Sequence, residues 1–196
     1  MKQRAGTLFF LLALIALLTI CPSLQAADEG PLSQKGTKQI GINIGYGYTL
    51  SNRDIRFAPG SPYFGYVFTD PVGNGWYRGT VEGIVEGDFN YVFKGQKRHA
   101  SGVTFLGRYN LLSKNECWRP YVQAGVGMVG TNLSMHHFGS DFNFTLNLGS
   151  GIQYFWNSCN AINFEWRYKH ISNAGINQHN VGLNMSMLLV GYSHTF

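Results

Sequence analysis

The chain has little charge, and what it has is nearly balanced. Residues 1–26 hold two cations and no acid, so the remainder keeps 13 Lys and Arg against 10 Asp and Glu, a net of +3. That balance is too mild to favour nucleic acid as a partner. After residue 26, no stretch is apolar enough for a transmembrane helix. Neither a linker nor a shift in composition divides the rest, which predicts a single domain.

The first 26 residues have the order of a secretory signal peptide. Lys2 and Arg4 form a charged start, residues 8–20 an apolar middle, and Leu24-Gln25-Ala26 a cleavage site. The apolar middle is too short for a helix that crosses a membrane. We therefore expect an exported protein, with 1–26 as the signal peptide and 27–196 as the mature domain.

Alternation of apolar and polar residues recurs along the mature chain. It is clear at residues 40–48, 81–91, 103–110 and 142–154. Successive side chains of a strand point to opposite faces, so alternation predicts strands with two unlike faces. A soluble sandwich also alternates, and the content of the faces decides between the two. One face is rich in Gly, Asn, Thr and charge, which suits a narrow lumen, and the other in aromatics, which suits lipid and its interfaces.

The pattern predicts an all-β fold, an eight-stranded antiparallel transmembrane β-barrel of the outer-membrane type. A barrel of this size is filled by side chains, and its closure satisfies the backbone hydrogen bonds that lipid cannot. Phe196 ends an alternating segment, and a terminal aromatic resembles the assembly signal of bacterial outer-membrane proteins. The expected strands are 38–50, 62–69, 77–92, 99–111, 120–134, 141–155, 161–172 and 182–196.

The order of the strands predicts which end of the barrel each turn occupies. With the N-terminus in the periplasm, odd strands run outward and even strands run back. Cys117 and Cys159 then fall in periplasmic turns, and we expect a disulfide between them, with two unpaired thiols as the alternative. His170 and Ser172 fall at the external end, beside the outer leaflet that contains lipopolysaccharide.

His170 and Ser172 continue the apolar face of their strand. Phe164, Trp166 and Tyr168 precede them on that face, because side chains repeat with a period of two. The two Cα atoms are expected about 6.6 Å apart. A neutral His within reach of a Ser hydroxyl can accept its proton and return it to a leaving alcohol. The alternative is a pair of ordinary interfacial residues, although polar groups that face lipid are costly and often functional.

The segment around this pair resembles the signature of the lipid A 3-O-deacylases, the PagL family. The strong resemblance covers about fifteen residues, and a weaker one, in strand count, length and terminal aromatic, covers most of the mature chain. The residues that carry it are His170-Ile-Ser172-Asn173-Ala-Gly175, followed by Asn180, Gly182 and Asn184.

The resemblance implies a serine esterase that removes the 3-position acyl chain of lipid A in the outer leaflet. It implies Ser172 as the nucleophile and His170 as the general base and acid. Asn173, with the backbone N–H groups near Ala174 and Gly175, is implied to hold the oxyanion. Gly tolerates the left-handed backbone that such a site needs. The alternative for these three residues is a strand-ending turn, and both readings can hold together.

One position departs from the family pattern. Some members carry a Glu on the last strand to orient the His, and the matching position here is Asn184. Its amide oxygen can accept the ring N–H, as Asn does in Cys-His-Asn proteases, but it stabilises an imidazolium less than a carboxylate does. Glu165 is a poor substitute, because its odd offset from His170 turns it into the lumen.

Other functions and partners are weaker predictions. A small barrel with a structural or adhesive role is the main alternative, and a channel is disfavoured because a barrel of this size is filled. We expect no metal and no cofactor, since loop histidines without carboxylate or Cys partners are usually solvated. Lipopolysaccharide is the expected partner, and the residues do not decide whether two barrels form a homodimer.

Overall fold

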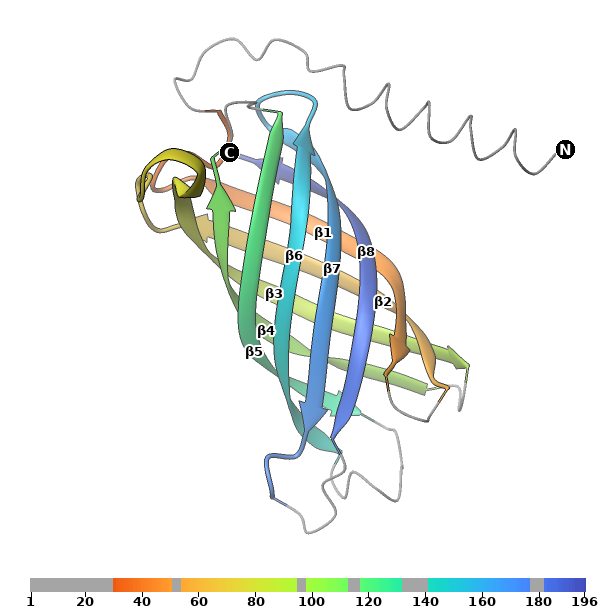
Figure 1. Cartoon of the computed structure of the whole chain (residues 1–196). Coiled ribbons are helices and arrows are strands. Elements are labelled where there is room, and N and C mark those ends of the chain that lie inside the picture. The colour runs from red at the N-terminus through yellow and green to blue at the C-terminus, as the bar shows by residue number, and fades with distance from the viewer. Residues whose placement is uncertain (1–29, 51–53, 95–97, 113–116, 132–140, 177–181) are drawn as a thin grey trace, which may run out of the picture.

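Eight antiparallel strands close into a barrel, in which β1 pairs with both β2 and β8 (Figure 1). The computed structural model describes residues 30–50, 54–94, 98–112, 117–131, 141–176 and 182–196. Within these ranges no helix is both long and apolar enough to cross a membrane. The strands are β1 Lys38–Thr49, β2 Arg56–Val67, β3 Gly79–Lys94, β4 Arg98–Leu111, β5 Trp118–Thr131, β6 Phe142–Phe155, β7 Asn160–Ser172 and β8 Leu183–Thr195, with a 3-10 turn, η1, at Gly75–Tyr77.

The predicted fold is confirmed, and seven of the eight strands begin and end within three residues of the expected positions. The exception is β2, which begins at Arg56 rather than at residue 62. Proline cannot donate to a ladder, so Pro59 and Pro62 are unfavourable inside a strand. Pro62 falls where the pairing of β2 with β3 is interrupted, between Gly60 and Tyr63, whereas Pro59 stays in register opposite Asn90.

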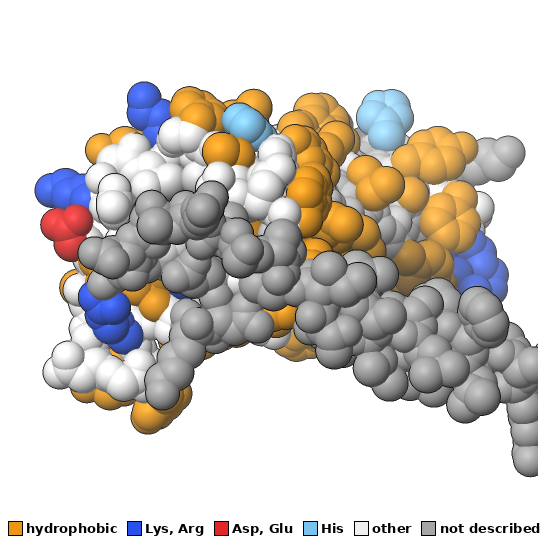
Figure 2. Space-filling view, turned by 90° about the horizontal axis from the view of Figure 1, so that it is seen from above, with side chains coloured by type: hydrophobic (Ala, Val, Ile, Leu, Met, Phe, Trp, Pro, Cys, Tyr) orange, Lys and Arg blue, Asp and Glu red, His pale blue; other side chains and the backbone are white. Residues whose placement is uncertain are grey.

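The outward face of the barrel is apolar, as the alternation predicts. On β1, for example, Ile40, Ile42 and Ile44 are exposed while Asn43 is buried. Seen from the end that carries the C-terminus, hydrophobic side chains lie along the outer wall and charged ones are scattered at its margin (Figure 2). An outer wall of this kind is stable against lipid and not against water.

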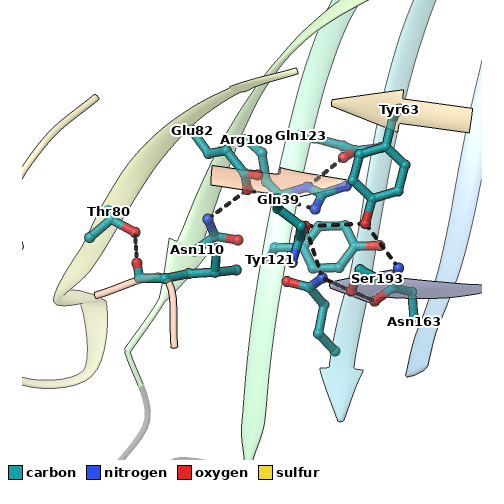
Figure 3. Close-up of polar contacts among 12 residues, drawn as sticks. Gln39, Tyr63, Thr80, Glu82, Arg108, Asn110, Tyr121, Gln123, Asn163 and Ser193 are labelled. Carbon is teal, nitrogen blue, oxygen red and sulfur yellow. Dashed lines mark hydrogen bonds and ion pairs between the residues drawn. The ribbon is translucent and has the colours of Figure 1, made fainter. Parts of the chain in front are cut away.

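The lumen is filled by hydrogen-bonded polar side chains. In its middle, Arg108 Nε donates to Gln123 Oε1 at 2.9 Å, and its guanidinium lies 4.1 Å from the ring centroid of Tyr121 (Figure 3). Asn110 Nδ2 donates to Glu82 Oε2 at 2.9 Å. Each of these side chains is at least nine-tenths buried. Such a network satisfies groups that neither lipid nor an apolar core would satisfy.

Apolar clusters lie in the lumen beyond this network. At the end where β7 finishes, the cluster is built around Phe57, Val129 and Met187, and at the other end it contains Leu32, Val67 and Phe155. The polar network at the centre of the lumen and the apolar clusters toward its two ends fill the interior of the described barrel with side chains. This packing disfavours the channel as a function.

The expected Cys117–Cys159 disulfide is wrong. Cys117 is fully buried, and Cys159 keeps a free thiol. Cys117 lies just before β5, and its carbonyl accepts a hydrogen bond from the Phe155 N–H at 2.8 Å. Cys159 lies in a separate turn, where its own N–H donates to Asn157 Oδ1 at 3.0 Å. Neighbouring turns on one side of a barrel therefore do not by themselves bring two sulfur atoms together.

Candidate active site

His170 and Ser172 lie at the end of β7, on the outward face. Both are half-buried, whereas the alternating residues Lys169 and Ile171 are buried in the lumen. The ladder places His170 directly opposite Asn184 on β8 and opposite Leu146 on β6. Strand parity and the pairing register of β7 with β8 together bring a His, a Ser and an Asn to one patch of the outer wall.

Asn184 contacts the imidazole directly. Its Oδ1 lies 2.7 Å from His170 Nδ1. An amide oxygen only accepts hydrogen bonds, so this contact requires a proton on Nδ1. The neutral ring then has its lone pair on Nε2, which is the tautomer that a general base needs.

Tyr168 forms a hydrogen bond with the same oxygen atom, Asn184 Oδ1. Its hydroxyl donates to Asn184 Oδ1 at 2.8 Å, so that oxygen accepts from both Tyr168 and His170. Reasoning from the sequence did not identify Tyr168 as a functional residue, because it reads as one more aromatic on a lipid face. The available signal was its position two residues before His170, on the same face of β7.

Gly182 leaves room for the imidazole. A Cβ atom at this position would lie 2.6 Å from His170 Cε1 and 3.2 Å from Nε2. Real Cβ atoms do not approach other heavy atoms so closely, so any larger residue requires the ring to move. Gly182 therefore helps to set the position of His170 through the space it leaves.

The chain turns sharply after Ser172. Ala174 has a φ of 52° and Gly175 a φ of 82°, two successive residues in the left-handed region. For Ala174 this backbone is strained, and such strain is concentrated at functional sites. Asn173 is fully buried, and its Oδ1 accepts the Gly175 N–H at 2.9 Å. The expected strand-ending turn is present, and it already uses the N–H group of Gly175.

An apolar groove of about 440 Å³ opens beside the pair on the outer wall. It runs from Ser172 and His170 across β6 and β5 to Phe105 on β4. Its floor and sides include Val126, Met128, Phe144 and Leu146, together with Gly127 and Thr145. A groove so lined suits a hydrocarbon chain, and Ser172 is one of the residues that line it.

Glu165 belongs to the lumen, as its parity predicts. Its carboxylate accepts hydrogen bonds from Tyr121 and Gln123, each at 2.9 Å. It therefore lies on the opposite side of the strand from His170. In the described part of the chain, no group of three or more His, Cys, Asp or Glu could hold a metal ion, and His136, His137 and His179 lie outside that part.

The arrangement suits one kind of chemistry. A hydroxyl and an imidazole of the required tautomer share a face, and a left-handed turn with backbone N–H groups follows at once. These are the parts needed to attack a carbonyl and to stabilise the resulting oxyanion. The adjacent groove suits an apolar chain attached to that carbonyl.

Comparisons with known proteins agree with this geometry. The family model described as Lipid A 3-O-deacylase (PagL) matches residues 61–193. No protein with a curated description matches the chain.

Several solved structures share the fold. The outer membrane enzyme PagL is 18% identical, with 78% of this chain and 97% of that chain covered and a TM-score of 0.57. The N-terminal β-barrel domain of Pseudomonas aeruginosa OprF is 17% identical, with 83% of this chain and 98% of that chain covered and a TM-score of 0.52. Neisserial surface protein A is 14% identical, with 82% of this chain and 96% of that chain covered and a TM-score of 0.52. At these identities the likeness shows the fold alone, that of a small outer-membrane barrel.

Proposed function

The chain belongs to the lipid A 3-O-deacylase (PagL) family, and from that premise we propose that it hydrolyses the 3-position acyl ester of lipid A. One observation carries the assignment of residues. His170 Nδ1 is bound to Asn184 Oδ1 on the outward face, beside Ser172 and the head of an apolar groove. A soluble substrate would not reach a lipid-facing site, whereas lipopolysaccharide is already in that layer.

The proposed reaction has two steps. Ser172 Oγ attacks the ester carbonyl while His170 Nε2 takes its proton, and a tetrahedral oxyanion forms. When the C–O bond to the sugar breaks, His170 gives the proton to the departing sugar oxygen, which leaves as a hydroxyl, and the acyl group stays on Ser172. Water, deprotonated by His170, then attacks this acyl-enzyme, and His170 passes the proton to Ser172 Oγ as the fatty acid is released.

The turn after Ser172 supports a role in binding the oxyanion. We assign this role to Asn173, Ala174 and Gly175, with the Ala174 N–H as the principal donor. The Gly175 N–H is bound to Asn173 Oδ1 at 2.9 Å, so in the substrate-free enzyme it stabilises the turn. A preformed left-handed turn keeps its donors in place as charge develops, which is where such donors contribute most.

The orientation of the barrel follows from the same proposal. If the C-terminal end faces the periplasm, the groove and Ser172 lie beside the outer leaflet, where lipid A is found. Expression of the wild-type chain in a Gram-negative host tests the function directly. Mass spectrometry should show lipid A lighter by one acyl chain. Unchanged lipid A from a host with well-folded barrel would leave a structural or adhesive role as the better conclusion.

Gly182→Ala should lower activity without unfolding the barrel. The new Cβ would meet the imidazole at 2.6 Å, and a misplacement of about 1 Å can cost roughly 100-fold in rate. We expect a 10- to 100-fold fall in kcat, measured as fatty acid release from purified lipopolysaccharide. Gly60→Ala is the control, because its Cβ would lie 4.0 Å from the nearest atom, Phe89 O. Equal activity of the two variants would count against the proposed place of His170.

Met128→Trp should narrow the groove and separate long substrates from short ones. Met128 lies opposite Phe144, which in turn lies opposite Ser172. We expect a fall of roughly 10-fold in kcat/KM on lipid A, since losing the burial of one or two methylene groups of the acyl chain weakens binding by about that factor. Hydrolysis of a short-chain nitrophenyl ester should change less than twofold. Val122→Trp, on the same face of β5 but outside the groove, is the matched control.

A further inference from the structure

The side-chain amide of Asn184 has an oxygen that accepts hydrogen bonds and an NH2 that donates them, whereas a carboxylate has two equivalent oxygens that both accept. With its oxygen toward His170, the ring carries a proton on Nδ1 and a lone pair on Nε2. With its NH2 toward His170, Nδ1 must accept, and the proton moves to Nε2. An imidazole of that second kind cannot take the proton of Ser172. An amide in this position therefore needs something that fixes its orientation.

Tyr168 supplies a directional contact of this kind. Its hydroxyl lies 2.8 Å from Asn184 Oδ1, the atom that His170 Nδ1 also contacts. A phenol donates better than it accepts, because the ring withdraws the oxygen lone pair. It therefore favours the amide orientation that turns Oδ1 toward it. A carbonyl oxygen has two lone pairs, so accepting from Tyr168 leaves one for His170.

The surroundings strengthen this preference. The three side chains lie on the outward face, where β7 and β8 pair in register and His170 stands opposite Asn184. Lipid supplies no donor or acceptor that could replace a lost hydrogen bond. An amide in the wrong orientation would therefore keep its poorer contacts instead of exchanging them for water.

We propose that Tyr168 is a positioning residue, which fixes the amide of Asn184 with its oxygen toward His170 and so sets the tautomer of the general base. The inference rests on the proposed function for its catalytic consequence. Its structural content, that the hydroxyl of Tyr168 decides which imidazole nitrogen carries the proton, is independent of any substrate.

The barrel contains a matched arrangement at its other end. Tyr192 OH donates to Asn160 Oδ1 at 2.6 Å, and His194 Nδ1 lies 2.9 Å from the same oxygen. These residues also come from β7 and β8, but Phe196 lies two residues after His194, whereas Ser172 lies two residues after His170. Tyr192→Phe thus removes the same kind of hydrogen bond from the same pair of strands, away from the proposed nucleophile.

The kinetic arm compares Tyr168→Phe with Tyr192→Phe on purified lipopolysaccharide. We expect Tyr168→Phe to lower kcat roughly three- to tenfold, the worth of one neutral hydrogen bond, with KM unchanged. Tyr192→Phe should change neither. In an Asn184→Ala background, Tyr168→Phe should lower kcat less than twofold further, because its only route to His170 is gone. An equal loss in both backgrounds would overturn the proposal, as would a wild-type kcat in Tyr168→Phe.

The second arm needs no activity. In protein labelled with 15N at histidine and held in detergent micelles, His170→Gln identifies the His170 signals. We expect the Nδ1-protonated form to predominate in the wild type and in Tyr192→Phe, and to lose population in Tyr168→Phe. An unchanged tautomer in Tyr168→Phe would overturn the proposal even if the enzyme is active. Absence of acyl release from the wild type would remove the proposed function alone, since this arm would still decide the role of Tyr168.

Discussion

Ser172→Ala should leave a folded barrel that no longer removes acyl chains. Loss of the nucleophile from a serine hydrolase costs roughly 10³-fold or more in kcat, because the hydroxyl and its base act as a unit. The fold should be unaffected, since Ser172 is a half-buried residue at the end of β7 and its substitution removes one oxygen atom. Mass spectrometry of lipid A from expressing cells measures the activity. The shift of the folded barrel on an unheated gel measures folding.

The chain offers a matched control for this substitution. Ser101 is exposed on the outward face of β4, two residues after His99, so it forms a second His-x-Ser. Across the strand pair, His99 stands opposite Tyr91, where His170 stands opposite Asn184. Ser101→Ala should deacylate lipid A as well as the wild type does. Acyl loss retained in Ser172→Ala, or abolished equally in both variants, would remove Ser172 from the role of nucleophile.

The sequence predicts the faces of the barrel well because a period of two allows little freedom. Once Phe164 and Trp166 face outward, His170 and Ser172 must follow, and Glu165 must enter the lumen. The antiparallel return of the last strand also brings Asn184 near His170. Prolines obscure this logic in β2, because a ladder can skip Pro62 while the strand continues.

Contacts that depend on side-chain direction or on distant strands escape such reasoning. The Cys117–Cys159 prediction fails because two neighbouring turns need not bring their sulfur atoms within bonding distance. The groove unites Phe105 with Ser172 only after four strands have paired, so no local pattern contains it. Tyr168 was missed for another reason. Its ring fits a lipid-facing strand, and only the structure shows that its hydroxyl meets Asn184.

Arg167→Met should destabilise the barrel more than any substitution at the site itself. Arg167 is buried in the lumen, between the carboxylates of Glu86 and Glu165. Its Nη2 donates to Glu86 Oε2 at 2.9 Å, and its Nε to Glu165 Oε1 at 2.5 Å. Methionine fills similar volume but strands two buried carboxylates, and breaking a buried ion pair in this way costs about 3–5 kcal/mol of unfolding free energy. Urea unfolding in micelles, followed by tryptophan fluorescence, measures the loss.

A compensated variant separates charge from packing. Arg167→Met combined with Glu86→Gln and Glu165→Gln removes the whole ionic cluster while keeping its shape, and such replacements are often close to neutral. We expect this triple variant to recover most of the lost stability. A triple variant as unstable as the single one would show that Arg167 acts through packing.

Arg167 alternates on β7 with Trp166 and Tyr168, so the ion pairs in the lumen hold the strand whose other face carries His170. Because these pairs fix the backbone and touch no part of the site, the kcat of each folded Arg167→Met molecule should stay within about twofold of wild type, the usual independence of sites that share no partner.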